Sequence, residues 1–265
     1  MKLRSYVSLT RLIISLLFIV GMILFSFSDI RSGLVIKRMS SETVNYLDTP
    51  EQVDDIKPVE PIKAPGTKDI VSEGSQSEEA LGYLSIPDLG INEPIYKNTT
   101  NETLLLGVSS LYPRRDPEED NIVIFGHHLG YYGYLFGQLN NAQKGMPVSL
   151  MYLGESYEYE VYERAIVPET RVDLVDNRHE QPYLTLVTCD SPDYTDQRTV
   201  VTAKLIKSEK LDPNAYKNKR TALSNQRQDN LKFIMNDLNK KLVILTIEII
   251  VGLLIINTLL IRRKK

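Results

Sequence analysis

Two long apolar runs stand near the two ends of this 265-residue chain, and they restrict what the chain between them can form. Residues 242–261 hold 20 residues, which is enough for a helix to cross about 30 Å of hydrocarbon. Residues 12–27 carry no charge and follow three basic side chains. We therefore predict a transmembrane helix at each end, with a separate folded region between them.

Basic residues set the expected orientation of both helices. They precede the first run, and residues 262–265 close the chain as Arg-Arg-Lys-Lys. Because positive residues favour the cytoplasmic side of a membrane, both termini are predicted to be cytoplasmic and the region between the helices extracytoplasmic. A cleavable signal peptide is the competing interpretation of the first run. A retained anchor is preferred because the run is long and no clear small-x-small cleavage site follows it.

Composition divides the chain between the two runs. Residues 31–80 are rich in proline, carry an acidic excess and have few apolar residues, which predicts an extended acidic linker. After residue 207 the chain becomes polar again, and Pro213 is placed to open a helix. The predicted parts are residues 1–30 (cytoplasmic tip and first transmembrane helix), 31–80 (linker), 81–207 (folded domain), 208–241 (polar, partly helical spacer), 242–261 (second transmembrane helix) and 262–265 (basic cytoplasmic tail).

The folded domain reads as mainly β. Short β-type runs recur at residues 81–86, 91–96, 121–125, 147–152, 157–162, 183–188 and 199–206. Residues 157–162 alternate strictly, as a half-buried strand does. Short strands separated by turn signals at this spacing favour a closed barrel over alternating strands and helices. No basic stripe with interleaved aromatics is present, so no nucleic-acid partner is expected.

Three residues at the ends of such runs form a chemically coherent set. Cys189, the only cysteine, ends one run, Arg198 begins the next, and His127 ends an earlier one. A thiol with a pKa of about 8.5 is only slightly ionised at neutral pH, and an imidazole can supply a cationic partner or a proton for a leaving amine. Arginine can stabilise a developing oxyanion with its fork of donors. Taken singly, each residue is better explained by packing or surface location; together they indicate acyl transfer.

These residues also resemble a family signature. Thr-Leu-Val-Thr-Cys at residues 185–189, followed by Arg198 and preceded by Gly126-His127, is similar to the sortase signature, and the similarity spans roughly residues 80–207. The resemblance implies an eight-stranded sortase-type β-barrel with short helices. It also implies a membrane-anchored cysteine transpeptidase of Gram-positive bacteria. Such enzymes cleave an LPXTG-like C-terminal sorting signal between Thr and Gly and pass the acyl group to an amine.

The resemblance assigns roles to individual positions. His127, Cys189 and Arg198 match the catalytic three, and Thr188 matches a position that contacts substrate or oxyanion. Residues 167–183 resemble a loop that covers the sorting signal. This loop makes Val167, Pro168 and Leu174 the apolar candidates for substrate binding. His128 is the alternative histidine, but neighbours in a strand point to opposite faces and the Gly-His pairing selects His127.

No cofactor and no metal are expected. Relatives with a calcium site make the acidic cluster Asp116, Glu118, Glu119 and Asp120 worth considering, because hard oxygen ligands suit calcium. The spacing of these residues does not reproduce the family pattern. A solvated acidic turn is the preferred interpretation.

The expected partners are the membrane, LPXTG-type surface-protein substrates, and either a lipid-linked peptidoglycan precursor or a pilin lysine as acceptor. The acidic residue after Cys189 is similar to wall-anchoring class A enzymes, whereas the second membrane helix is more like pilin-polymerising class C enzymes. Two further alternatives stay open. One is a catalytically silent, membrane-tethered assembly module for pili or surface proteins, and the other is a secreted cysteine hydrolase.

Overall fold

A computed structural model describes residues 2–63, 65–66, 69–70, 78–129, 134–177, 181–192 and 195–262. The chain divides into two compact units, one of residues 35–232 and one of residues 1–34 with 233–265. The last three residues of the predicted basic tail and residues 71–77 of the predicted linker lie outside the described residues.

The larger unit is built on one sheet. Its strands are β1 (Asn45–Tyr46), β2 (Glu79–Ile86), β3 (Ile91–Tyr96), β4 (Val108–Ser110), β5 (Asn121–Phe125), β6 (Pro147–Tyr152), β7 (Glu155–Pro168), β8 (Tyr183–Cys189) and β9 (Gln197–Lys210). Its short helical elements are η1 (Pro50–Gln52), η2 (Pro87–Leu89), α4 (Thr103–Leu106), η3 (Leu139–Asn141) and η4 (Val172–Val175).

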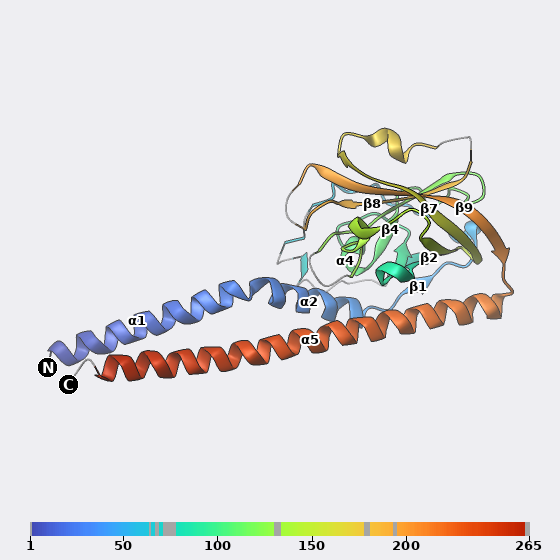
Figure 1. Cartoon of the computed structure of the whole chain (residues 1–265). Helices are drawn as coiled ribbons and strands as arrows, with labels where there is room; N and C mark the ends of the chain where they lie inside the picture. The colour runs from blue at the N-terminus through green and yellow to red at the C-terminus, as the bar shows by residue number, and fades with distance from the viewer. Residues whose placement is uncertain are drawn as a thin grey trace. The chain divides into compact units, whose positions relative to one another are not determined.

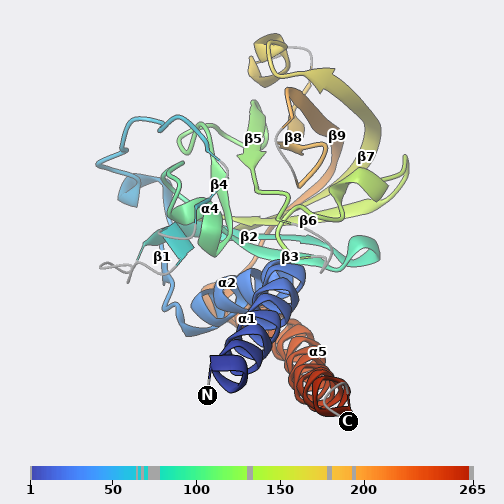
Figure 2. The same cartoon turned by 90° about the vertical axis from the view of Figure 1, so that its left-hand side faces the viewer.

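The sheet closes into a barrel. The strand order is β1-β2-β3-β4-β5-β8-β9-β7-β6, and β2 also pairs with β6, so eight strands from β2 to β6 form the ring. β1 adds to the start of β2 in parallel. Figure 2 shows β5, β8, β9 and β7 side by side on one wall. The prediction of a mainly β, eight-stranded barrel with short helices is confirmed.

Alternation along each strand separates the two faces of this wall. Ile122, Ile124, Leu184, Leu186 and Val201 belong to the main core, which fills the barrel. Val123, Val187 and Val200, at alternate positions on the same strands, are buried at the centre of a second, smaller cluster on the outer face. Apolar side chains therefore line both faces of the wall, as expected where something covers a sheet on its outer side.

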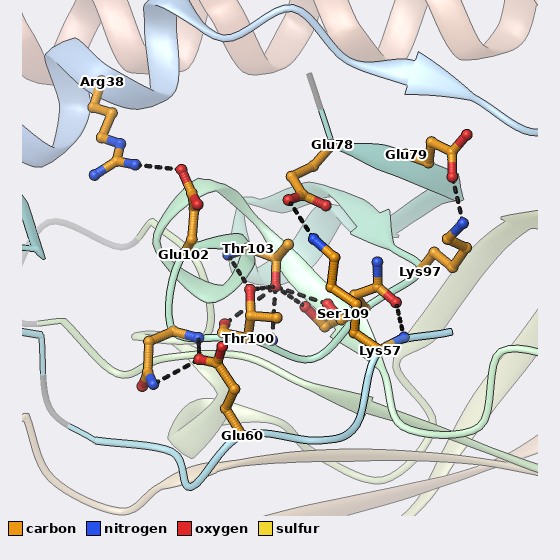
Figure 3. A network of polar contacts seen from close by, with 12 residues as sticks. Arg38, Lys57, Glu60, Glu78, Glu79, Lys97, Thr100, Glu102, Thr103 and Ser109 are labelled. Atoms are coloured by element: carbon orange, nitrogen blue, oxygen red, sulfur yellow. Dashed lines mark hydrogen bonds and ion pairs between the residues drawn. The ribbon is translucent and has the colours of Figure 1, made fainter. Parts of the chain in front are cut away.

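The segment predicted as an extended linker is partly helical and lies against the barrel. Helix α2 (Phe27–Ser41) runs past the predicted boundary at residue 31. Figure 3 shows the polar contacts of this region: Arg38 pairs with Glu102, and Lys57 pairs with Glu78 at 3.4 Å. The backbone N–H of Glu60 also donates to the carbonyl of Thr99. The contacts with Thr99 and Glu102 fix the segment to the loop after β3.

Helix α5 (Pro213–Arg262) begins where the sequence predicts a helix. Asp212 caps it, since its Oδ1 accepts from the backbone N–H groups of Asn214 and Ala215, each at 3.0 Å. The helix continues without a break, so the region predicted as a partly helical spacer is helical from Pro213 onward. Within the larger unit, Tyr216 of α5 packs on Tyr83 of β2 and Met151 of β6.

The smaller unit consists of helix α1 (Lys2–Phe25), the start of α2 and the rest of α5. Phe18 of α1 packs directly on Gly252 of α5, where a Cβ would meet the ring at 2.3 Å. Helix α5 is long and apolar enough to cross a membrane. Residues 9–41 form a helix pair bent by 52° that passes the same test as one broken span. Among the described residues these are the candidate spans (Figure 1).

Candidate active site

The thiol of Cys189 faces the outer side of the barrel wall. Cys189 is the last residue of β8, and Val187, two residues earlier, belongs to the outer apolar cluster. Residues two apart share a face of a strand, so the two side chains point the same way. Cys189 is half-buried. A half-exposed thiol at a strand end is accessible to a polypeptide lying along this wall.

Arg198 lies directly opposite Cys189. The two residues are Cα partners in the antiparallel β8–β9 ladder, and Val167 of β7 pairs with Arg198 from the other side. Residues directly opposite each other in such a ladder present their side chains on one face. The guanidinium donates to Glu169 Oε2 at 2.5 Å and to the carbonyls of Thr195 and Gln197 at 3.0 and 2.9 Å. These bonds hold it at the rim of the wall.

His127 approaches Cys189 from the third strand. Phe125 pairs with Val187 in the parallel β5–β8 ladder, and the N–H of Gly126 donates to the carbonyl of Val187 at 3.1 Å. If this register continued for two more residues, His127 would be level with Cys189. The His127 side chain is buried. The structure therefore sets Arg198 opposite Cys189, and His127 follows the end of β5, the strand that pairs with β8 on its other side.

The second histidine contacts the backbone of the cysteine. His128 Nδ1 donates to the carbonyl oxygen of Cys189 at 3.1 Å, which places the ring proton on Nδ1. No pattern in the sequence predicts this bond. It connects the end of β5 to the end of β8, and it stabilises the backbone on which the thiol sits.

Asn140 of the η3 segment forms a bridge behind the cysteine. Its Nδ2 donates to the carbonyl of Asp190 at 2.6 Å, and its Oδ1 accepts from Thr199 Oγ1 at 2.5 Å. Asp190 follows Cys189, and Thr199 follows Arg198. The Asn140 side-chain amide therefore links the residue after Cys189 to the residue after Arg198.

The electrostatic environment of Cys189 disfavours the thiolate form and raises the pKa of the thiol. Burial raises the pKa of Cys189 above its ordinary value. The positive charge of Arg198 acts in the opposite direction, whereas the carboxylates of Asp190 and Glu169 raise the pKa further. Glu169 thus opposes thiolate formation, and it also occupies the guanidinium that favours it.

Two of the apolar substrate-binding candidates meet beside this site. Val167 and Leu174 both pack on the outer cluster around Val187 and Val200. In Figure 1 the η4 turn that carries Leu174 lies above β7, β8 and β9. Val167 and Pro168 belong to the end of β7 rather than to a loop, since they pair with Arg198 and Gln197. Pro168 is not part of the described cluster.

The side chain of Thr188 lies on the other face. It is buried, and its neighbours Leu186 and Val201 belong to the barrel core. Its partner in the ladder is Thr199, which is fully buried. The structure therefore places the Thr188 hydroxyl inside the barrel wall and leaves its backbone as the part nearest the thiol.

Hydrogen bonds hold the η4 turn over the outer face. Asn121 Nδ2 donates to the carbonyls of Leu174 and Asp176 at 3.3 and 3.0 Å, and Arg115 Nη1 donates to the carbonyl of Val175 at 3.0 Å. Both donors come from the region before His127. These bonds therefore fix the η4 turn in place over the apolar surface beside Cys189.

The acidic cluster before β5 forms a turn. Asp120 Oδ2 accepts from the backbone N–H of Asp116, and Asp116 Oδ1 accepts from that of Glu118, at 2.9 and 2.8 Å. Within the described part of the chain, no group of three or more histidine, cysteine or acidic side chains is arranged to hold a metal ion. The expectation that the protein needs no metal stays a prediction.

Comparison with known proteins gives one consistent result. A family model described as Sortase domain matches residues 84–206. The chain is 30% identical over 223 residues to Sortase A of Streptococcus agalactiae, covering 78% of this chain and 89% of that protein. It is 27% identical to Sortase A of Listeria monocytogenes over 210 residues, with 77% and 94% covered. A crystal structure of the Listeria monocytogenes enzyme aligns over 53% of this chain and 96% of its own, at 32% identity and a TM-score of 0.49.

Proposed function

Because this chain belongs to the sortase family, we propose that it is a membrane-anchored cysteine transpeptidase that cleaves an LPXTG-like sorting signal between Thr and Gly. The observation that carries the proposal is the pairing of Cys189 with Arg198 across β8 and β9, with His127 just beyond the end of the neighbouring strand β5. A thiol, a permanent cation and an imidazole on one rim are the groups that thioacyl transfer requires.

The first half of the reaction forms a thioester. The Cys189 thiol passes its proton to His127, and its sulfur attacks the threonine carbonyl carbon of the signal, so that a tetrahedral intermediate forms with negative charge on its oxygen. Arg198 stabilises that charge. As the intermediate collapses, the bond from carbon to the glycine nitrogen breaks, and His127 supplies the proton that the leaving amine needs. The product is a thioester between the protein substrate and Cys189.

The second half regenerates the enzyme. An acceptor amine attacks the thioester carbonyl, His127 takes up the amine proton, and the carbon–sulfur bond breaks to release the Cys189 thiolate, which recovers its proton from His127. The acceptor nitrogen ends in a new amide bond. No oxidant or reductant is consumed, so the chain's own side chains are sufficient for both steps.

Substrate binding must change the state of the site. Burial and the nearby carboxylates keep the pKa of Cys189 raised, and Glu169 binds the guanidinium of Arg198 at 2.5 Å. A bound peptide carbonyl would compete with Glu169 for the same donors. We propose that this exchange turns Arg198 toward the reacting oxygen and lowers the pKa of the thiol at the moment when it is needed.

The apolar residues of the sorting signal are proposed to lie beneath the η4 turn. Val167 and Leu174 pack there beside Val187, in line with Cys189 along β8. Pro168 adjoins Val167 at the end of β7. Of Thr188, the backbone rather than the buried hydroxyl is the part we assign to substrate or oxyanion contact.

The candidate spans support a location at the membrane. We propose that α1 and the last part of α5 both cross it, with both termini cytoplasmic and the barrel outside. The basic residues at both ends of the chain support this orientation, because positive residues favour the cytoplasmic side. The predicted parts of the chain fit it with one change, since residues 35–63 lie against the barrel instead of forming a free linker.

The test uses the full chain in detergent micelles with an LPXTG-type peptide. Triglycine and a lysine-bearing pilin peptide compete as acceptors, and intact mass spectrometry follows Cys189. An adduct that passes to triglycine supports transfer to a wall precursor, and passage to lysine supports pilin polymerisation. Cys189→Ala is the matched control and forms no adduct. Absence of an adduct in the folded wild-type chain favours the silent assembly module, and release to water alone favours a hydrolase.

A further inference from the structure

A buried ion pair joins α5 to the barrel wall. Arg227 Nε donates to Glu93 Oε2 of β3 at 2.8 Å, and each of the two side chains is only 5% exposed. Arg227 Nη2 also donates to the carbonyl of Leu106 at 2.5 Å. Burying two charges carries a large desolvation penalty, so such a pair is a weak source of stability by itself. A buried ion pair more often serves to hold the two elements that it joins in one defined geometry.

The other oxygen of Glu93 holds a strained residue. Glu93 Oε1 accepts from the backbone N–H of Leu135 at 3.0 Å. Leu135 is fully buried and has a φ of 55°, in the left-handed region that a leucine rarely adopts. Backbone strain of this kind persists only where surrounding contacts fix it. The bond from Leu135 to Glu93 is one such contact.

The residue after Leu135 contacts the backbone of His127, the proposed catalytic histidine. The backbone N–H of Phe136 donates to the carbonyl of His127 at 3.1 Å. Its ring packs against Gly126 so closely that a Cβ at Gly126 would lie 2.6 Å from it. Residues 135–136 therefore contact both His127 and the residue before it. A shift of this turn must move the end of β5.

These contacts form one continuous chain from α5 to the backbone of His127. Resting on the proposed function, we infer that Arg227 is a positioning residue: through Glu93 and the Leu135–Phe136 turn it fixes where His127 stands relative to Cys189. Arg227 itself does not touch the reacting atoms. Because Glu93 lies on β3, a residue of helix α5 can influence the position of the end of β5.

Helix α5 provides a matched control. Arg220 lies about two turns earlier on the same helix, pairs with Asp48 and stacks over the ring of Tyr46 at 4.3 Å. Its side chain is also largely buried, at 13% exposure. Among the contacts of the described residues, none joins Arg220 to Glu93 or to the Leu135–Phe136 turn. Removing its charge disturbs the attachment of α5 but leaves the connection to His127 intact.

The experiment compares Arg227→Met and Arg220→Met in the full chain in detergent, at a temperature where thermal unfolding shows both to be folded. We expect Arg227→Met to lower kcat by about 10- to 100-fold, as a misplaced catalytic group does, with KM within about twofold. Arg220→Met should retain kcat within about twofold. A folded Arg227→Met with wild-type kcat would overturn the inference, and so would an equal loss in both variants.

A second measurement is independent of turnover. Cys189 is the only cysteine, so the pH profile of its alkylation by iodoacetamide reports on the site without any peptide substrate. Arg227→Met should move this profile in the same direction as His127→Ala, and Arg220→Met should not. An Arg227→Met profile identical to that of the wild type counts against the inference. If the wild type has no turnover, the proposed function fails while this arm still decides the role of Arg227.

Arg227→Lys covers the case in which Arg227→Met does not fold. Lysine keeps a positive charge near Glu93 but loses the fork that reaches Leu106 as well. We expect a smaller fall in kcat than in Arg227→Met, in the same direction, with KM again unchanged. Full wild-type kcat and an unmoved alkylation profile in Arg227→Lys, together with failure of Arg227→Met to fold, would assign Arg227 to stability alone.

Discussion

Cys189 and Arg198 lie directly opposite each other across β8 and β9, yet the guanidinium of Arg198 binds Glu169 at 2.5 Å. The backbone ladder thus sets Cys189 and Arg198 opposite each other, while Glu169 binds the guanidinium of Arg198. This arrangement separates two properties that substitutions can test independently, the donor geometry of Arg198 and the charge of Glu169.

Arg198→Lys should lower kcat/KM by about 100-fold, since losing one well-placed oxyanion donor costs about two to three orders of magnitude and lysine retains the charge. A lysine ammonium cannot donate in parallel to two acceptors as the guanidinium does. Peptide cleavage kinetics in the full chain provide the measurement, and thermal unfolding confirms an intact fold. Wild-type kcat/KM in Arg198→Lys would mean that only the charge matters.

Glu169→Gln should make Cys189 more reactive at neutral pH. The Glu169 carboxylate raises the pKa of the thiol and also occupies Arg198, so a neutral amide of the same shape removes the first effect and weakens the second. The pKa of Cys189 should therefore fall, and the rise of alkylation rate with pH should begin at a lower pH. The shift should be modest, because the Glu169 side chain is 51% exposed and solvent screens its charge.

Asp173→Asn is the control for that shift. Asp173 pairs with Arg171 at 2.8 Å on the segment that follows Glu169, and it is not among the charges that act on Cys189. Its alkylation profile should match the wild type. An equal shift in Asp173→Asn and Glu169→Gln would point to a general effect of surface charge and remove the specific role of Glu169.

Much of the barrel could be predicted because strand alternation is a local property of the sequence. β5 and β6 have the predicted limits, and β8 extends only one residue further. β7 and β9 run longer than predicted, since each pairs with the other over its full length and this pairing overrides weak local patterns. Likewise, helix α2 extends into a segment whose composition predicts a linker.

The residues of the candidate site likewise fall into those that the local sequence predicts and those that it does not. His127, Cys189 and Arg198 stand at the ends of recognisable runs, so their sequence neighbours reveal them. Glu169 and the pair Arg227–Glu93 do not, because their roles come from partners 29 and 134 residues away. Spacing along a chain carries no signal for such contacts. The burial of Thr188 follows from alternation with Cys189, and the family motif alone obscures it.

Asn140→Ala should loosen the backbone behind the nucleophile. The change removes the bonds to the Asp190 carbonyl and to Thr199 Oγ1. The Thr199 side chain is fully buried, so its unpaired hydroxyl should cost about 1–3 kcal/mol of unfolding free energy. The midpoint of thermal unfolding should fall, and kcat should fall with it at temperatures where the chain is folded. In Asn140→Ala/Thr199→Val the hydroxyl is gone as well, so part of the stability should return; no recovery would contradict this assignment.

Gly126→Ala should displace the catalytic histidine without touching any charged group. A Cβ at Gly126 would lie 2.6 Å from the Phe136 ring and 2.9 Å from a Val108 methyl, closer than such atoms approach. Either the buried ring or the end of β5 must move, so kcat should fall about 10-fold or more, as for a small misplacement of a catalytic group. A smaller side chain in Gly126→Ala/Phe136→Leu should recover part of kcat relative to the two single variants. Losses that add without any recovery would show that Gly126 acts on His127 by a route other than its contact with Phe136.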